Sequence, residues 1–185
     1  LADFCVILVA DRTWHQKITA WEGSKTDVAQ RHVFSDKALD RIRLQALASE
    51  VPDGFEIRAI DSGLAGRMLA EVSENLVPDL FWKSSDDFIK RGFGYCALSN
   101  GRVEAGVTSA LLIDAAAGIQ INTNPGHQGK GLATALGARF LLDCLDRGIE
   151  PHWDTGDPAS YHLAEKLGYQ LADAYSVLEW DPQRK

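Results

Sequence analysis

The sequence has few of the features that mark several protein classes. Only three cysteines occur among 185 residues, Cys5, Cys96 and Cys144, and no two of them form a Cys-x-x-Cys pair. This spacing argues against a disulfide framework or a zinc site. The longest apolar run, residues 4–10, is too short to cross a membrane, and Asp3 stands where a signal peptide carries positive charge. We therefore expect a cytoplasmic protein that holds no metal and contacts no membrane.

Basic charge is also scarce. The chain has 19 Lys and Arg against 26 Asp and Glu, a net charge of -7. No broad attraction to nucleic acid is expected, and a neutral or cationic substrate suits this charge better. The remaining composition, 45% hydrophobic and 9% aromatic, is that of a globular protein. The length allows one domain, or one domain with a partial second module.

The segment Pro52-Asp53-Gly54 is the best internal boundary. Before it, the pattern favours strands between residues 4 and 20, and Ser35 is expected to cap a helix with apolar residues at helical spacing. Residues 1–53 are predicted to be an N-terminal appendage, either a partial companion domain or a contact in a homodimer. Residues 54–185 are predicted to be the main domain.

The main domain reads as α+β. A strand over residues 55–60 precedes two helices, one capped by Ser62 and one capped by Ser84 and closed by Gly92. Asn100-Gly101, between strand-like runs, predicts a hairpin, and a third run over residues 118–123 extends it to an antiparallel meander.

The C-terminal third alternates helices and strands. A helix is expected over residues 131–147, with Gly148 after its last turn, and a strand over residues 149–153. A second helix begins with Asp157 as its N-cap and Pro158 at its first position, and ends at Gly168. A strand over residues 174–180 completes the order.

The most informative segment is the glycine loop, residues 124–134, between a strand and a helix. Glycines let the backbone approach a ligand, and the free N–H groups that begin a helix suit a phosphate. A Walker A loop would need glycine at Asn124 and Ser or Thr at Gly131. A dinucleotide fingerprint would need a small residue at Thr134 and parallel strands before it. A tight turn that needs glycine only for its dihedral angles remains the alternative.

Two segments carry a resemblance to a known family. Gln128-Gly129-Lys130-Gly131-Leu132-Ala133 resembles the acyl-CoA pyrophosphate loop of the GNAT superfamily of N-acyltransferases, which reads Gln or Arg, two residues, Gly, one residue, then Gly or Ala. Residues 157–169, ending Leu163-Ala164-Glu165-Lys166-Leu167-Gly168-Tyr169, are similar to the superfamily's later helix motif. The resemblance covers residues 55–180. Several segments, among them Gly92-Phe93-Gly94-Tyr95 and Pro151-His152-Trp153-Asp154, are similar to the branch that contains the zwittermicin A resistance acetyltransferase.

The resemblance implies a mixed, mainly antiparallel central sheet flanked by helices, with an N-terminal strand and helix appendage. It also implies an acetyl-CoA-dependent N-acetyltransferase whose two central strands part around the cofactor. The cofactor-binding residues it implies are Ile121, Asn122, Thr123, Gln128, Gly129, Lys130, Gly131, Leu132, Ala133, Thr134, Asp157 and Ser160. Asp157 replaces the family's Asn and is equally explained as a helix cap.

The catalytic residues do not follow directly from the motifs, because the family's usual tyrosine acid is replaced by Ala164. Tyr161, three residues earlier on nearly the same helical face, is the substitute candidate, with simple packing as its alternative. Asp154 is the candidate to take the proton of the amine, with a solvated turn carboxylate as its alternative. Proton loss through water would also suffice.

The acceptor is expected to be a primary amine of a small molecule that attacks directly in a ternary complex. The departures at Ala164 and Asp157 motivate a different class, a regulatory or sensor module that binds acyl-CoA without transferring its acyl group.

Overall fold

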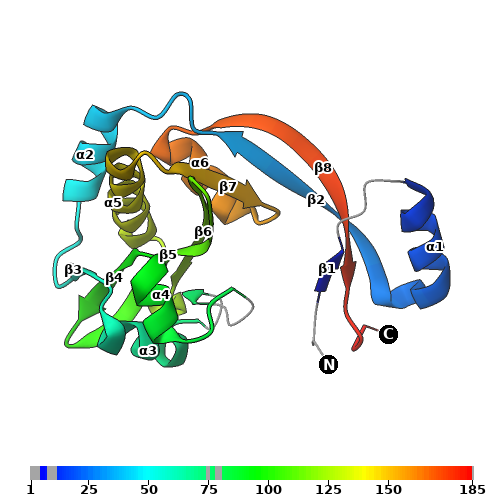
Figure 1. The fold of residues 1–185 in the computed structure, drawn as a ribbon, viewed down its shortest axis with the longest axis horizontal. Coiled ribbons are helices and arrows are strands. Elements are labelled where there is room, and N and C mark those ends of the chain that lie inside the picture. The colour runs from blue at the N-terminus through cyan, green and yellow to red at the C-terminus, as the bar shows by residue number, and fades with distance from the viewer. Residues whose placement is uncertain (1–4, 8–11, 74–75, 78–80, 185) are drawn as a thin grey trace.

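The computed structural model describes residues 5–7, 12–73, 76–77 and 81–184. Within these ranges the strands form one sheet in the order β1-β8-β2-β7-β6-β5-β4-β3 (Figure 1). The strands are β1 (Cys5–Ile7), β2 (Thr26–Ser35), β3 (Glu56–Ala59), β4 (Gly94–Ser99), β5 (Arg102–Ile113), β6 (Ala116–Thr123), β7 (Glu150–Thr155) and β8 (Gln170–Trp180). The helices are α1 (Arg12–Glu22), α2 (Arg41–Ser49), α3 (Ser62–Glu71), α4 (Ser85–Arg91), α5 (Leu132–Arg147) and α6 (Pro158–Leu167).

All neighbouring strands in the described sheet pair antiparallel except β6 and β7, which run parallel. The α5 crossover joins these two strands, as a parallel pair requires. The predicted α+β class and the meander of β4, β5 and β6 are therefore confirmed.

Two helical layers cover the body of the sheet. On one face α2, α5 and α6 pack in a single apolar cluster that includes Leu44, Phe140 and Trp153. On the other face α3 packs against β4 and β5 through a second cluster that includes Met68 and Val103. Figure 1 shows α2 and α5 on one side of the strands, with α3 and α4 on the other.

Local chemistry explains most helix ends. Asp157 accepts hydrogen bonds from the N–H groups of Ala159 and Ser160, and α6 ends at Gly168 with a φ of 106°. Ser84 caps α4, as predicted. The expected caps Ser35 and Ser62 were wrong: Asp40 and Asp61 lie at the N-caps of α2 and α3, where a carboxylate reaches two or three residues ahead.

The N-terminal prediction of strands between residues 4 and 20 is corrected. Residues 12–22 form helix α1, and only Cys5–Ile7 is a strand, while residues 4 and 8–11 lie outside the described ranges. Strand β2 over Thr26–Ser35 was not predicted. It pairs with β8 over nearly its whole length, a partner about 145 residues away that local sequence does not reveal.

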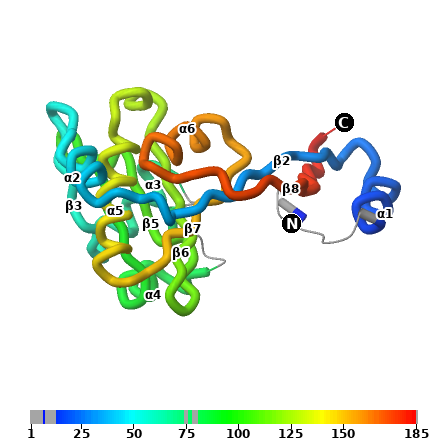
Figure 2. Tube along the Cα trace, turned by 90° about the horizontal axis from the view of Figure 1, so that it is seen from above, coloured from blue at the N-terminus to red at the C-terminus, as the bar shows by residue number. Residues whose placement is uncertain are grey.

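Strands β2 and β8 form a long ribbon that leaves the body and carries β1 and α1 at its far end (Figures 1 and 2). Trp180 on β8 donates a hydrogen bond to Glu22 of α1 at 3.0 Å. The part of the ribbon nearest the body also pairs with β7, so residues of the expected appendage contribute to the central sheet. A domain boundary near residue 53 stays a prediction.

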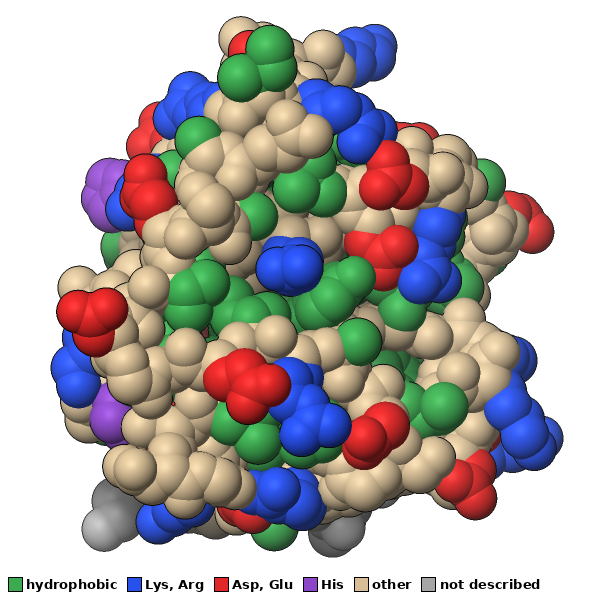
Figure 3. Space-filling view, turned by 90° about the vertical axis from the view of Figure 1, so that its left-hand side faces the viewer, with side chains coloured by type: hydrophobic (Ala, Val, Ile, Leu, Met, Phe, Trp, Pro, Cys, Tyr) green, Lys and Arg blue, Asp and Glu red, His purple; other side chains and the backbone are tan. Residues whose placement is uncertain are grey.

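The surface of the body carries charges of both signs. Figure 3 shows acidic and basic side chains interspersed with apolar ones over the face remote from the ribbon. Arg41 pairs with Asp146, and Arg147 with Asp143, across and along the α2–α5 pair. Within the described residues, no helix combines the length and the hydrophobicity that crossing a bilayer needs.

Cys96 and Cys144 are buried free thiols. Burial raises the pKa of Cys144 to about 12 and that of Cys96 to about 11. Neither thiol is therefore ionised at neutral pH, and both act as small apolar side chains.

The close contact of β4 and β5 gives a stability prediction. A Cβ at Gly94 would lie 2.3 Å from the main-chain oxygen of Val107, so Gly94→Ala should lower the free energy of unfolding by about 1–3 kcal/mol or more. Gly66, exposed on α3 with nothing within 4 Å of an added Cβ, is the matched control, and Gly66→Ala should stabilise by about 0.5–1 kcal/mol. Urea unfolding measures both, and equal effects would contradict the packing argument.

Candidate active site

The site begins where β6 and β7 part. Their parallel pairing covers Ala116–Gly118 against Glu150–His152. Beyond Gly118, β6 pairs only with β5, and Trp153–Thr155 of β7 pair with β2. The middle of the described sheet therefore has a gap between β6 and β7, with cavities opening from it.

The first cavity lies beside the N-termini of α5 and α6 and has a volume of about 500 Å³. It is lined by β6, the glycine loop and α6: Ile121, Asn122, Thr123, His127, Gln128, Gly129, Gly131, Leu132, Ala133, Thr134, Asp157, Ala159, Ser160, Leu163 and Lys166. Eleven of the twelve residues that the resemblance implies for cofactor binding are in this set. Lys130 is the exception.

The glycine loop owes its shape to two left-handed residues. Gly129 has a φ of 74° and Gly131 a φ of 93°, while an added Cβ at either position would meet nothing within 4 Å. Backbone conformation, and not lack of space, therefore requires glycine here. Gln128 ties the loop to the sheet, because its side-chain amide donates to the main-chain oxygen of Thr123 at 3.1 Å.

Helix α5 begins without a side-chain cap. Its N-cap is Gly131, which has no side chain to accept the first N–H groups, whereas Asp40, Asp61, Ser84 and Asp157 cap the other α-helices whose caps the structure describes. The N–H groups at the start of α5 therefore point at the first cavity with the positive end of the helix dipole behind them. This arrangement suits a phosphate.

A second cavity, of about 520 Å³, opens at the same gap and is lined mainly by polar residues. Gln120 and Asn122 contribute from β6, Asp154 from β7, Arg31 from β2 and Glu179 from β8. The two cavities share Ile121, Asn122, Asp157 and Ser160 in their linings. They therefore meet at the point where β6 and β7 part.

Asp154 lies at the centre of a polar cluster in the second cavity. Arg31 Nε donates to Asp154 Oδ1 at 2.6 Å, and the hydroxyl of Tyr175 donates to Oδ2. Partial burial, and then the hydrogen bond and charge of Asp154, raise the pKa of Tyr175 above its usual value. The phenol therefore stays protonated at neutral pH, and the cluster pairs one cation with one anion.

The structure does not bring Tyr161 to either cavity. Its ring packs edge-on against Phe34 and His32, with centroids 4.9 and 5.1 Å apart, on the β2 side of α6. Ala164 is fully buried in the main apolar cluster, so its methyl group takes part in packing. Asp157 is used as the cap of α6, although it also lines both cavities.

Two polar atoms at the cavity wall are buried without a partner. Among the described residues, Asn122 Nδ2 and Thr123 Oγ1 have no hydrogen bond in the structure. Buried polar groups are normally paired, so unpaired ones beside a cavity suggest a ligand that completes them. Pantetheine, which carries two amides, offers both acceptors and donors to such groups.

Sequence reasoning missed Arg31 and Tyr175. Arg31 lies on β2, which was not predicted, and Tyr175 lies on β8, a predicted strand whose pairing with β2 was not predicted. Arg31 stands opposite Tyr175 in the pairing of β2 with β8. This pairing is the only feature that could have pointed to the two residues, and it can be recognised only once the register of the two strands is known. Within the described ranges, no three His, Cys, Asp or Glu side chains gather as metal ligands would.

Comparison with known proteins identifies the family. A family model for the GNAT acetyltransferases matches residues 2–178. The chain belongs to the GNAT acetyltransferase family. The uncharacterized N-acetyltransferase YdfB of Bacillus subtilis is 30% identical over 130 residues, 69% of this chain and 49% of that protein. This GNAT chain therefore spans about half the length of the curated relative it matches.

Solved structures support the same fold. A GCN5-related N-acetyltransferase-like protein from Streptococcus suis superposes with a TM-score of 0.86 and is 33% identical, over 92% of this chain and 68% of that one. A GNAT-family acetyltransferase structure from Novosphingobium aromaticivorans has a TM-score of 0.60 at 20% identity, over 86% of this chain and 69% of that one, and shows the fold alone. The predicted GNAT-like fold is confirmed.

The Asp154 cluster yields a pH prediction. Asp154→Asn removes a negative charge that disfavours the phenolate, so the pKa of Tyr175 should fall, while burial should keep it above the usual value for tyrosine. An ultraviolet titration of tyrosine ionisation measures the change. Tyr175→Phe identifies which step in the curve belongs to Tyr175. An unchanged Tyr175 step in Asp154→Asn would contradict the contact.

Proposed function

We propose that this GNAT chain binds acetyl-CoA in the first cavity and transfers the acetyl group to a primary amine of a small molecule in the second. The observation that carries this proposal is the meeting of the two cavities at the parted strands, through Ile121, Asn122, Asp157 and Ser160. Two ligands in these cavities would contact each other there. Direct attack in a ternary complex needs such a meeting point.

The first cavity fits acetyl-CoA along its length. The uncapped N–H groups of Leu132, Ala133 and Thr134 suit the pyrophosphate, and the unpaired Asn122 Nδ2 and Thr123 Oγ1 suit the amides of the pantetheine arm. Ser160 adds a hydroxyl between the two cavities. When bound, acetyl-CoA supplies an acetyl group activated as a thioester.

The second cavity suits a cationic amine. Its lining carries Asp154, Asp157 and Glu179 against the single cation Arg31, and Arg31 is paired with Asp154. Among the described contacts, no cation is paired with Glu179. A net negative lining attracts an ammonium group, in agreement with the net charge of -7.

Asp154 is the group we propose to accept the proton of the amine. An amine must lose its proton to attack, and a carboxylate can accept about four hydrogen bonds. Arg31 and Tyr175 supply three contacts to Asp154, of which two reach the carboxylate, so acceptor capacity remains for the substrate. Tyr161 is not part of the proposed machinery, because it faces β2.

The branch of the family is a finer part of the same proposal. Membership of the branch that contains the zwittermicin A resistance acetyltransferase rests on motif similarity and would favour an aminated metabolite or antibiotic as the acceptor.

The second candidate function is acyl-CoA binding without transfer. Ala164 favours it, since a buried methyl group stands where the family usually has a tyrosine acid.

Ligand binding at the glycine loop is tested by thermal unfolding. Acetyl-CoA at about 100 times its dissociation constant should stabilise the wild-type chain by roughly 2.7 kcal/mol and raise its melting temperature by several degrees. Gly131→Val should abolish this shift, because a β-branched residue disfavours a φ of 93°. Gly131→Asn should lose less of the shift, because asparagine tolerates left-handed backbone better.

Gly126→Ala is the matched control for the loop. Gly126 lies in the same loop with an ordinary φ and open space around it, so this variant should keep the full shift. The absence of any shift in the wild-type chain at millimolar acetyl-CoA would contradict both candidate functions.

Transfer is tested by the release of free CoA thiol in the presence of a panel of small primary amines. Release of CoA with one of these amines would show transfer. Double-reciprocal plots of the initial rate that intersect when both substrates are varied would support direct attack in a ternary complex. Asp154→Asn should lower kcat by about 100-fold, the lower range of a general base. Asp143→Asn, an α5 carboxylate paired with Arg147 and outside both cavities, should keep the rate.

The outcomes separate the two candidate functions. A chain that is stabilised by acetyl-CoA but releases no CoA with any amine would favour the non-catalytic alternative. Release that is unchanged in Asp154→Asn would show that the proton leaves through water.

A further inference from the structure

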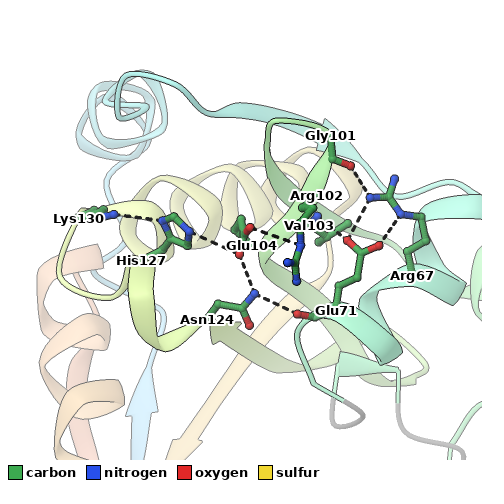
Figure 4. Close-up of polar contacts among 9 residues, drawn as sticks. All are labelled: Arg67, Glu71, Gly101, Arg102, Val103, Glu104, Asn124, His127 and Lys130. Atoms are coloured by element: carbon green, nitrogen blue, oxygen red, sulfur yellow. Dashed lines mark hydrogen bonds and ion pairs between the residues drawn. The ribbon is translucent and has the colours of Figure 1, made fainter.

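A line of polar side chains leads from the rim of the first cavity into the body, and Figure 4 shows its members. Lys130 Nζ lies 3.1 Å from His127 Nδ1, and His127 Nε2 lies 3.6 Å from Glu104 Oε2. Asn124 Nδ2 donates to the same Glu104 oxygen at 2.7 Å and to the main-chain oxygen of Glu71 at 3.0 Å. The line therefore connects the glycine loop with β5 and α3.

The inner members of this line are held in place. The Glu104 side chain is 12% exposed and that of His127 is 27% exposed. Phe55 packs edge-on against the imidazole with centroids 5.2 Å apart. Asn124 is also fixed to β5, because its N–H donates to the main-chain oxygen of Glu104 at 2.8 Å. The orientation of His127 is thus set by its neighbours, not by solvent.

The contacts determine which imidazole nitrogen carries the proton. An ammonium group only donates, so the His127 nitrogen that faces Lys130 must hold a lone pair. The proton of a neutral imidazole then lies on Nε2, which faces the Glu104 carboxylate. The charged groups around His127 are Lys130 and Glu104, with Arg102 at 3.9 Å from the other Glu104 oxygen. The negative charge of Glu104 favours this tautomer.

The line ends beside the proposed phosphate site. His127 lines the first cavity, and Lys130 stands between the lining residues Gly129 and Gly131. Lys130 itself is exposed and does not line the cavity. An exposed lysine without a partner would sample many rotamers, at a cost in entropy when it binds. The contact with His127 keeps its ammonium at the rim.

We propose that Glu104 and His127 are positioning residues that hold the ammonium of Lys130 at the rim of the first cavity for the phosphate groups of an acyl-CoA. The inference rests on the proposed function. Glu104 orients His127, and His127 accepts from Lys130, so the positive charge is in place before the ligand arrives. The line should therefore favour a phosphate-bearing acyl donor over an acylpantetheine that lacks phosphate.

The test compares two acyl donors by calorimetry on the full chain. Glu104→Gln should weaken binding of acetyl-CoA by about three- to fivefold, as expected for the loss of one partly exposed charge contact. It should change binding of S-acetylpantetheine by less than about twofold, because that ligand carries no phosphate. Lys130→Met, at an exposed position where the fold is unaffected, should show the same selective loss.

A double-mutant cycle separates positioning from general destabilisation. If Glu104 acts through Lys130, Glu104→Gln should cost little further affinity in the Lys130→Met background. Asp143→Asn, a carboxylate of similar exposure in the Arg147 ion pair, is the control and should bind both donors as the wild type does.

Other results would overturn the inference. Equal losses for both acyl donors, or additive losses in the cycle, would show that Glu104 acts only on the fold. A wild-type chain that binds S-acetylpantetheine and acetyl-CoA equally well would remove the role of Lys130 while leaving acyl binding intact. A wild-type chain that binds neither donor would overturn the proposed function as well.

Discussion

The parallel contact of β6 and β7 extends over only three residue pairs, and the arrangement of the site depends on where it stops. Beyond Gly118 and His152 the two strands keep their pairing with β5 and β2, but the edges that they turn toward each other face a gap. An interior sheet normally pairs all of its backbone groups, so this gap is the place where a ligand with amides can be accepted. Both cavities open from it, and they share Ile121 and Asn122 of β6 and Asp157 and Ser160 at the start of α6.

Helix α5 both packs in the core and begins at the first cavity, and these two roles set different requirements for its N-terminal end. Its apolar side, with Leu136, Phe140 and Cys144 fully buried, is the centre of the main cluster and must be rigid. Its N-terminus must stay free of side-chain caps if the N–H groups are to bind a phosphate. Gly131 meets both demands, because it ends the loop in a left-handed conformation and contributes no side chain to compete with a ligand.

The parts of the fold that were predicted are those with local causes. Asn100 and Gly101, both with positive φ, fix the β4–β5 hairpin, and Gly148 and Gly168 end α5 and α6 in left-handed conformations. Strand β2 was missed because its register is set by β8, far along the chain, and because most of its residues are at least partly exposed. Helix α1 was read as strand because Ile18 and its neighbours favour either structure and the helix has few tertiary contacts.

The residues of the candidate site likewise differ in whether the local sequence could reveal them. The glycine loop could be located because its residues are contiguous and its chemistry is in the backbone. The Arg31–Asp154–Tyr175 cluster could not, since its members come from three strands whose alignment is a tertiary property. The Glu104–His127 contact likewise joins the loop that follows β6 to β5, and the register of those two strands brings the loop beside Glu104.

The position of β7 has a mechanical consequence. It is hydrogen-bonded to β6 over three residue pairs and to β2 over three others. This short strand therefore joins two larger parts of the sheet, the meander on one side and the ribbon on the other. A ligand bound in the gap would contact both β6 and β7 and so limit changes in the angle between the meander and the ribbon. The second cavity takes walls from both parts of the sheet, from β6 and from Arg31 and Glu179 of the ribbon, so its shape would also depend on whether a ligand fills the gap.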